Sequence, residues 1–254
     1  MTTPGTFVWY ELMTTDVEAA KAFYGAVVGW TAQSMPMPGM DYTLFNVGDR
    51  GAAGLMPLMD EAKAQGIPPC WTGYVAVPDV DAAGAAFEAD GGKILKGPMD
   101  IPEVGRFSVA ADPQGAVLCL FRGEGEGNPQ QPFGTPGYAG WHELMTSDLE
   151  AGFAFYARQF GWTKDHDMDM GPMGTYRIFA HDGAAYGGMM KRDEHTPVSY
   201  WRFYFTVPSV NEAVDKVKAG GGEVLHGPME VPGGTYVCLC LDPQKALFAV
   251  CGPQ

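Results

Sequence analysis

Short alternating runs of apolar and polar residues dominate this chain, and single amphipathic segments interrupt them. The first run, FVWYELM at 7–13, alternates with a period of two residues, which is typical of a β-strand. The next segment repeats apolar residues at helical spacing and ends at Gly29, a residue type common just after a helix. Its apolar face consists of Val17, Ala20, Phe23, Tyr24 and Val27. Later runs such as DYTLFNVG and RFSVAAD complete a predicted order of strand, helix and three strands.

The starts of three predicted helices carry a hydroxyl residue followed three positions later by Glu, which is the pattern of a capping box. The pairs are Thr15 with Glu18, Ser147 with Glu150, and Ser209 with Glu212. We therefore expect Thr15, Ser147 and Ser209 to cap these helices.

The pattern of one strand, one helix and three strands occurs four times. VWYELMTTDVEAAKAFYGAVVGW at 8–30 returns as GWHELMTSDLEAGFAFYARQFGW at 140–162, a shift of 132 residues. A different sequence, VPDVDAAGAAFEADGGKILKGPMDIP from Val77, returns from Val207 at a shift of 130 residues. The chain is therefore an internal duplication, and each half contains two related modules.

The segment 123–138 is rich in Gly, Pro and Gln and lacks apolar periodicity, so it is predicted to be a linker. The predicted first domain covers 1–122 and the predicted second domain covers 139–254. The modules are expected at about 7–58, 71–122, 139–190 and 200–251.

Four βαβββ modules in two pairs resemble the vicinal oxygen chelate superfamily, which includes glyoxalase I, bleomycin-resistance proteins and extradiol dioxygenases. The resemblance rests on MTTDVEAAKAFYGAVVGW, MTSDLEAGFAFYARQFGW, VAVPDVDAAGAAFEADGGKIL and AADPQGAVLCLF, and it covers nearly the whole chain outside the linker. It implies an α+β fold of two tandem glyoxalase-like domains, each a cup of curved mixed β-sheet with helices outside. It does not select an activity, because the family includes isomerases, dioxygenases, epimerases, lyases and non-catalytic drug binders.

The resemblance also locates the positions at which catalytic members bind a divalent metal ion, usually through His, Glu or Gln. These positions stand seven residues before the start of each helix and seven residues after the Asp of each DPQ turn. In this chain they hold Trp9, Thr72, Cys119, Trp141, Arg202 and Ala249. An indole does not coordinate a hard cation and a guanidinium repels one. We therefore expect no metal and no cofactor, which argues against the family's metal-dependent mechanisms.

The segment WHELM at 141–145 places a His beside a Glu, as zinc-protease motifs do. Thr146 stands where the second His of HExxH is required, and the segment is predicted to be a strand rather than a helix. All five histidines lie in the second half, so a duplicated metal site has no histidine ligands in the first half. Strand alternation directs His142 toward the helix-covered face, where we expect it to be packed and hydrogen-bonded.

Glu11 and Glu143 are the main candidates for chemistry. Alternation places them on the same strand face as Trp9 and Trp141, inside the cups. A carboxylate there costs free energy unless it is paired or protonated. It could act as a general base or anchor a donor group of a ligand. The structural alternative is a Glu bonded to backbone N–H groups or to a basic partner such as Arg106.

Further candidate ligand contacts are tryptophans near the first strands and methionines in two loops. The tryptophans are Trp9, Trp71, Trp141 and Trp201. They could stack on a planar ligand, or they could only fill the volume of a lost metal site. Met37 and Met173 lie in Met-rich segments that could form a pliable lip or serve only as filler.

Composition limits the partners. The formal net charge of −14 argues against nucleic acid, which requires clustered Lys and Arg. No apolar run is long enough to span a membrane and no signal peptide is evident, so we expect a cytoplasmic protein without a membrane partner. The five cysteines match no zinc pattern and are expected to be reduced core thiols. A monomer and a homodimer are both compatible with the sequence.

The leading hypothesis is a metal-independent protein like the bleomycin-resistance members, which binds a small planar organic ligand in the cup of one or both domains. The first alternative is a metal-independent lyase, isomerase or hydroxylase-type enzyme that uses Glu11 or Glu143 as a general base. The second is a non-catalytic interaction scaffold.

Overall fold

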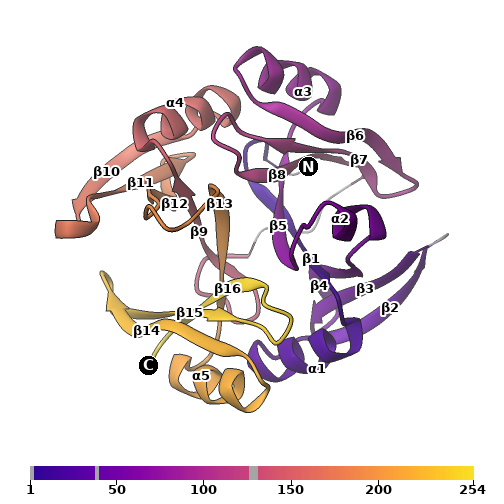
Figure 1. Cartoon of the computed structure of the whole chain (residues 1–254), viewed down its shortest axis with the longest axis vertical. Helices are drawn as coiled ribbons and strands as arrows, with labels where there is room; N and C mark the ends of the chain where they lie inside the picture. Colours follow the sequence, from indigo (N-terminus) through magenta and orange to yellow (C-terminus); the bar gives the residue numbers. More distant parts are fainter. Residues whose placement is uncertain (1–2, 38–39, 126–130) are drawn as a thin grey trace. The chain divides into compact units, whose positions relative to one another are not determined.

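A computed structural model describes residues 3–37, 40–125 and 131–254 (Figure 1). Its first half contains two modules, and each has one strand, one helix and three strands. The first module comprises β1 (Phe7–Thr14), α1 (Val17–Val27), β2 (Thr31–Met37), β3 (Met40–Val47) and β4 (Arg50–Pro57), followed by the short helix α2 (Asp60–Ala64). The second comprises β5 (Cys70–Ala76), α3 (Val80–Ala89), β6 (Lys93–Ile101), β7 (Gly105–Ala111) and β8 (Val117–Gly123).

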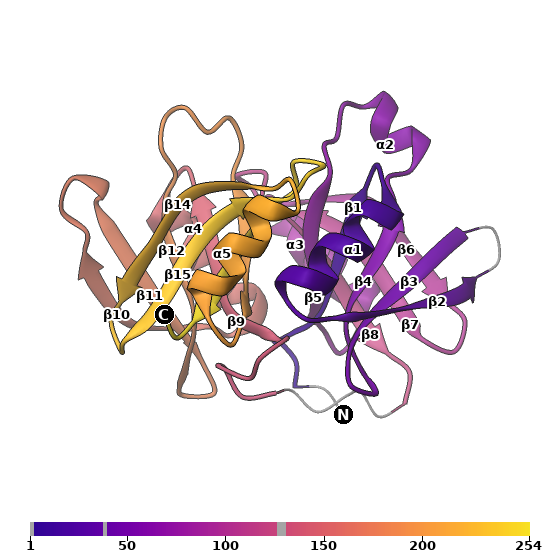
Figure 2. The ribbon, with the colours of Figure 1, turned by 90° about the horizontal axis from the view of Figure 1, so that it is seen from below.

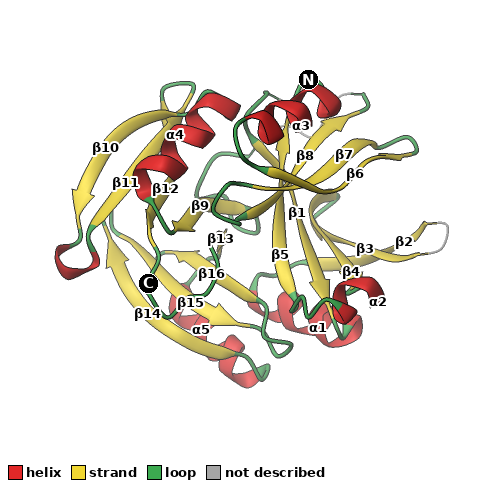
Figure 3. Cartoon of the chain, turned by 45° about the horizontal axis from the view of Figure 1, so that its top comes forward, coloured by secondary structure: helices red, strands yellow, loops and turns green. Residues whose placement is uncertain are grey.

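The second half repeats this order, with strands again forming most of each module (Figure 3). The third module comprises β9 (Ala139–Thr146), α4 (Leu149–Phe160), β10 (Thr163–Asp169), the 3₁₀ turn η1 (Gly171–Met173), β11 (Thr175–His181) and β12 (Ala184–Lys191). The fourth comprises β13 (Tyr200–Thr206), α5 (Val210–Ala219), β14 (Glu223–Val231), β15 (Thr235–Leu241) and β16 (Leu247–Gly252). The predicted βαβββ order is confirmed in all four modules.

The strands form two eight-stranded mixed sheets. Their orders are β2-β3-β4-β1-β5-β8-β7-β6 and β10-β11-β12-β9-β13-β16-β15-β14. The first strand of the first module pairs in parallel with β4, and the register places Glu11 opposite Gly54. The third module repeats this arrangement, with Glu143 of β9 opposite Gly188 of β12. The predicted α+β class with two glyoxalase-like domains is confirmed.

The chain packs as two compact units, and each unit contains segments from both halves. Unit 1 contains Met1–Val8, Thr72–Gln130 and Trp141–Trp201, and unit 2 contains Trp9–Trp71, Gln131–Gly140 and Arg202–Gln254. Within unit 1, α3 packs beside α4. Within unit 2, α1 packs beside α5 (Figure 2). The division of the chain at 123–138 stays a prediction, and residues 126–130 of that segment lie outside the described residues.

A buried hydrogen-bonded chain links different modules inside each unit. In unit 2, Trp71 Nε1 donates to Tyr24 Oη at 2.9 Å, and Tyr24 Oη donates to Asp242 Oδ2 at 3.1 Å. In unit 1, Trp201 donates to Tyr156 at 3.1 Å, and Tyr156 donates to Asp112 at 3.0 Å. Burial, followed by the nearby aspartate, raises the pKa of both tyrosines, so each keeps its proton and acts as a donor.

The helix starts differ in part from the expected capping boxes. Asp16 and Asp148, rather than Thr15 and Ser147, accept the backbone N–H groups of Ala19 and Ala151 at 3.0 Å. A carboxylate is a good acceptor there because it also interacts favourably with the positive end of the helix dipole. Ser209 is the N-cap of α5, as predicted, and accepts from the N–H of Glu212 at 3.3 Å.

Across the described residues, no helix has the length and apolar character needed to cross a membrane.

Candidate ligand-binding site

Three side chains of the first module form a continuous hydrogen-bonded set. Trp9 and Glu11 project from β1, and Tyr42 comes from β3. Trp9 Nε1 donates to Tyr42 Oη at 3.1 Å, and Tyr42 Oη donates to Glu11 Oε2 at 3.2 Å. The carboxylate of Glu11 is therefore held by a hydroxyl that an indole N–H positions in turn.

A glycine on the intervening strand makes this arrangement possible. Gly54 lies on β4, between β1 and β3, directly opposite Glu11. A Cβ atom at Gly54 would lie 2.5 Å from Glu11 Oε1 and 2.8 Å from Tyr42 Cζ, and it would overlap the Tyr42 hydroxyl. The side chain of Tyr42 thus crosses β4 through space that only glycine leaves empty.

The third module contains the same residue types in the same places. Trp141 Nε1 on β9 donates to Tyr176 Oη on β11 at 2.8 Å. Gly188 lies opposite Glu143, and a Cβ atom there would overlap the ring and hydroxyl of Tyr176. We call Trp9, Tyr42 and Glu11, and likewise Trp141, Tyr176 and Glu143, the Trp–Tyr–Glu set of each module.

The sets combine a buried carboxylate with a partly exposed indole. Glu11 and Glu143 are each 6% exposed, whereas Trp9 and Trp141 are half-buried. Burial and the carboxylate of Glu11 raise the pKa of Tyr42, so its hydroxyl is protonated at neutral pH. Each set therefore offers a flat apolar surface beside a negatively charged acceptor.

Two of the predicted tryptophans do not join these sets. Trp71 and Trp201 are 7% and 6% exposed, and their indole N–H groups bond to the helix tyrosines Tyr24 and Tyr156. Trp71 also packs against Trp30 and Phe205 in the core of unit 2. The interpretation of Trp71 and Trp201 as part of a stacking floor is not supported by these positions.

The remaining candidates lie apart from the sets. Met173 is on the 3₁₀ turn η1 and is 61% exposed. Met37 ends β2, and its side chain lies outside the described part of the structure. Arg106, the suggested basic partner of Glu11, instead pairs with Asp81 and Asp100, each at 2.8 Å.

The residues at the family's metal positions do not fit a divalent cation. The indole N–H groups of Trp9 and Trp141 are donors to tyrosine hydroxyls, and an indole offers no lone pair for a metal. Ala249 has no donor atom, and Arg202 is cationic. Among residues 3–37, 40–125 and 131–254, no group of three or more His, Cys, Asp or Glu side chains is arranged to hold a metal ion.

His142 is a packed core residue, as predicted. It is 1% exposed, its Nδ1 lies 3.0 Å from the Tyr186 carbonyl oxygen, and its ring stacks on Phe7 at 4.5 Å. Burial lowers its pKa to about 4. The imidazole is therefore neutral at pH 7 and lies under the sheet rather than beside Glu143, because alternation separates adjacent strand residues.

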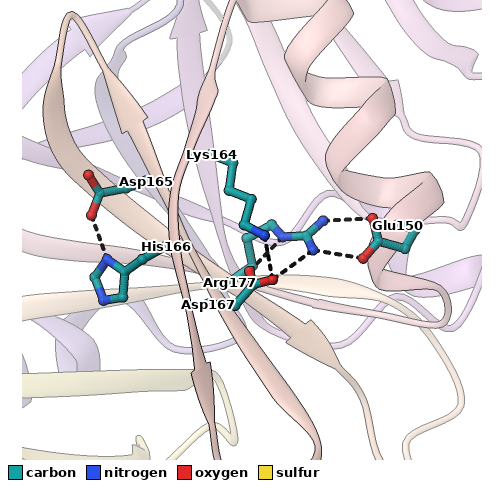
Figure 4. Close-up of polar contacts among 6 residues, drawn as sticks. All are labelled: Glu150, Lys164, Asp165, His166, Asp167 and Arg177. Carbon is teal, nitrogen blue, oxygen red and sulfur yellow. Dashed lines mark hydrogen bonds and ion pairs between the residues drawn. The ribbon is translucent and has the colours of Figure 1, made fainter.

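An ion-pair network strengthens the outer strands of the third module only (Figure 4). Arg177 on β11 bonds to both oxygens of Glu150, at 2.7 and 2.8 Å, and to Asp167 at 2.9 Å. Lys164 bonds to Asp167 at 2.6 Å. The equivalent of Arg177 in the first module is the buried Thr43. The network ties α4 to β10 and β11, the strand that also carries Tyr176.

The analysis of sequence patterns missed Tyr42, Tyr176, Gly54 and Gly188. One signal was present, because a shift of 134 residues maps Tyr42 onto Tyr176 and Gly54 onto Gly188. The signal gained meaning only through the strand register, which places each glycine opposite a glutamate.

Comparison with known proteins agrees with the architecture. Residues 6–48 match the family described as bleomycin resistance protein-like N-terminal, and residues 138–250 match the glyoxalase/bleomycin resistance protein/dioxygenase superfamily. The chain is similar to "Putative glyoxylase CFP32" of Mycobacterium tuberculosis, with 32% identity over 98% of this chain and 95% of the relative. It is also 31% identical to the anthracycline biosynthesis protein DnrV of Streptomyces peucetius, over 97% of this chain and 93% of the relative.

Solved structures resemble the fold at low sequence identity. The Mn(II)-bound glyoxalase of Novosphingobium aromaticivorans has a TM-score of 0.68 at 15% identity, covering 99% of this chain and 83% of that one. The 2,2',3-trihydroxybiphenyl 1,2-dioxygenase of Sphingomonas wittichii has a TM-score of 0.67 at 12% identity, covering 99% of this chain and 91% of that one. The duplicated βαβββ modules, the matched family models and the full-length relatives lead to one conclusion. This chain belongs to the glyoxalase/bleomycin resistance protein/dioxygenase superfamily.

Proposed function

We propose that this protein binds a small planar organic molecule at the Trp–Tyr–Glu set of one or both modules, without a metal ion. The observation that carries the proposal is the duplicated set itself. A buried carboxylate, fixed by a tyrosine hydroxyl and flanked by a partly exposed indole, occurs in both the first and the third module.

The chemistry of the set suits a flat, mainly apolar ligand. Ligand sites combine a large apolar surface with a few fixed polar groups that orient the molecule. Trp9 and Trp141 provide aromatic faces, which favour offset stacking on another ring system. Glu11 and Glu143 provide the polar anchor. The Streptomyces relatives are named for anthracycline biosynthesis, and anthracyclines contain fused planar rings, which is consistent with this ligand class.

The residues at the metal positions support a metal-independent role. Trp9 and Trp141 occupy places at which metal-dependent members of the family carry a ligand, and their N–H groups are donors. Binding would then rest on stacking, burial and hydrogen bonding.

Binding to the native state raises the melting temperature, so a thermal-shift screen of planar aromatic compounds, followed by calorimetry, tests the proposal. Glu11→Gln and Glu143→Gln, made separately and together, should weaken binding about tenfold or more per affected site, because a charged acceptor becomes a weaker neutral one. Glu18→Gln is a matched control, since that carboxylate is 82% exposed and pairs only locally with Lys21. Unchanged affinity in the double variant, at equal folded fraction, would contradict the proposal.

A second candidate is proton transfer by Glu11 or Glu143 next to a carbonyl. It is favoured by the 3.2 Å bond between Tyr42 and Glu11, because a positioned carboxylate is the geometry a general base requires. A relative named as a glyoxylase is consistent with it. Turnover that Glu→Gln abolishes while ligand affinity persists would favour this enzyme over a binding protein.

A further inference from the structure

We infer that the ligand must present a neutral hydrogen-bond donor, a hydroxyl or an N–H group, to the carboxylate of the Trp–Tyr–Glu set. The inference rests on the proposed function and refines its ligand class. It follows from where the protons of the set already point.

Each donor in the first set has one proton, and that proton is already committed. The indole N–H of Trp9 is its only polar hydrogen, and it points to Tyr42 Oη. Because the Tyr42 oxygen accepts this bond, the single phenolic proton is directed at Glu11 Oε2. The order of donation is therefore fixed from indole to phenol to carboxylate. Trp141 and Tyr176 begin the same order in the third module.

The group that can still bind a ligand is an acceptor. A carboxylate has two oxygens with about four acceptor positions, so the bond from Tyr42 uses only part of its capacity. A ligand hydroxyl or N–H can therefore bond to it. An anionic ligand would meet a nearly buried negative charge, and repulsion is strong where water is excluded. An ether oxygen would face another acceptor and lose its hydrogen bond to water without replacement.

Tyr42 and Tyr176 are positioning residues that set this preference. Replacing the phenol by a phenyl ring would release the indole N–H of Trp9 or Trp141. A released N–H could donate to an ether or carboxylate oxygen of the ligand. The selectivity of the site should therefore change even if the protein remains fully folded.

The test measures three flat probes of the same size against the full chain by calorimetry at pH 7. They are 2-naphthol, 2-methoxynaphthalene and 2-naphthoate. We expect 2-naphthol to bind at least about tenfold more tightly than either of the others, the effect of one hydrogen bond to a charged acceptor. In the variant Tyr42→Phe/Tyr176→Phe the ratio between the naphthol and the methyl ether should fall to about threefold or less.

Tyr236→Phe is the control, because Tyr236 also donates to a glutamate, Glu230, but lies exposed on β15. It should leave all three affinities unchanged. The single variants Tyr42→Phe and Tyr176→Phe assign the effect to a module and replace the double variant if that one does not fold.

The outcomes separate the two levels of the argument. Equal binding of the naphthol and its methyl ether, or tighter binding of 2-naphthoate, would overturn the donor inference and leave ligand binding intact. A ratio that stays the same after removal of both phenols would also overturn it. Failure of all three probes to bind would overturn the proposed function together with the inference.

Discussion

Replacing Gly54 by Ala should disrupt the first Trp–Tyr–Glu set without altering the backbone preference of β4. Gly54 is not among the residues with positive φ, so alanine can adopt its conformation. The added methyl group would lie 2.5 Å from Glu11 Oε1 and 2.8 Å from Tyr42 Cζ, and it would overlap the Tyr42 hydroxyl. Tyr42 must therefore leave its position, and both hydrogen bonds of the set break.

The expected loss of stability follows from two contributions. Inserting a methyl group into a packed region costs about 1–3 kcal/mol. Two lost hydrogen bonds add about 0.5–1.5 kcal/mol each. Because a displaced tyrosine regains part of its hydration, we expect a net loss of about 2–4 kcal/mol, equivalent to a lowering of the melting temperature by roughly 5–15 °C for a chain of this length. Urea unfolding followed by tryptophan fluorescence measures this change, and Trp9 reports the site directly.

Two further variants show whether Tyr42 is the cause. In a Tyr42→Ala background, the added cost of Gly54→Ala should fall by about 1 kcal/mol or more, because the main clash is gone. Gly51→Ala is the matched control on the same strand. Its Cβ would lie 3.2 Å from Trp9, and the third module carries Ala185 at the equivalent position, so the expected loss is below about 1 kcal/mol. A Gly54→Ala protein as stable as the parent, or an undiminished loss without Tyr42, would refute the reasoning.

Three other predictions concern the metal, acid stability and the linker. Elemental analysis after dialysis should find no stoichiometric divalent metal, whereas close to one zinc, nickel, iron or manganese ion per chain would contradict the expectation. His142 has its pKa lowered by burial to about 4, so the unfolded state binds more protons below pH 6.5; stability should fall by up to about 3 kcal/mol between pH 6.5 and pH 4 and the loss should shrink in His142→Asn, which keeps a donor but does not titrate. Limited proteolysis should cut within 123–138 before it cuts within 7–122, and the fragments should co-elute because the bonds from Tyr24 to Asp242 and from Tyr156 to Asp112 join them within each unit; early cleavage inside 7–122 would count against the linker.

The fold was predictable because repetition reveals it. Four copies of one apolar pattern define four modules, and each copy corrects uncertainty in the others. The helix caps were less predictable, since Thr15 and Asp16 are both good capping residues and their order along the backbone decides which one accepts. Local geometry gave Asp16 and Asp148 this role, and Ser147 instead donates to Gln114 at 2.5 Å.

The site was only partly predictable, and the misplaced tryptophans show why. Trp71 directly precedes Thr72, the residue equivalent to Trp9, so strand alternation directs it to the opposite face. The same argument applies to Trp201, which precedes Arg202. Proximity along the sequence suggested one shared surface, whereas the period of two separates these residues. Tyr42 and Tyr176 required the pairing of three strands, which no single segment specifies.

The duplicated sets raise a question that stability measurements cannot answer alone. The two copies differ around the sets, with Tyr10 against His142 and Thr43 against Arg177, yet each set keeps Trp, Tyr, Glu and the opposing glycine. Mutual packing is one sufficient reason, since the tyrosine needs the glycine and the carboxylate needs the tyrosine. A purely structural role therefore predicts the same loss of stability as a functional one. Only a change in the ratio of ligand affinities distinguishes them, because packing has no reason to favour a hydroxyl over a methyl ether.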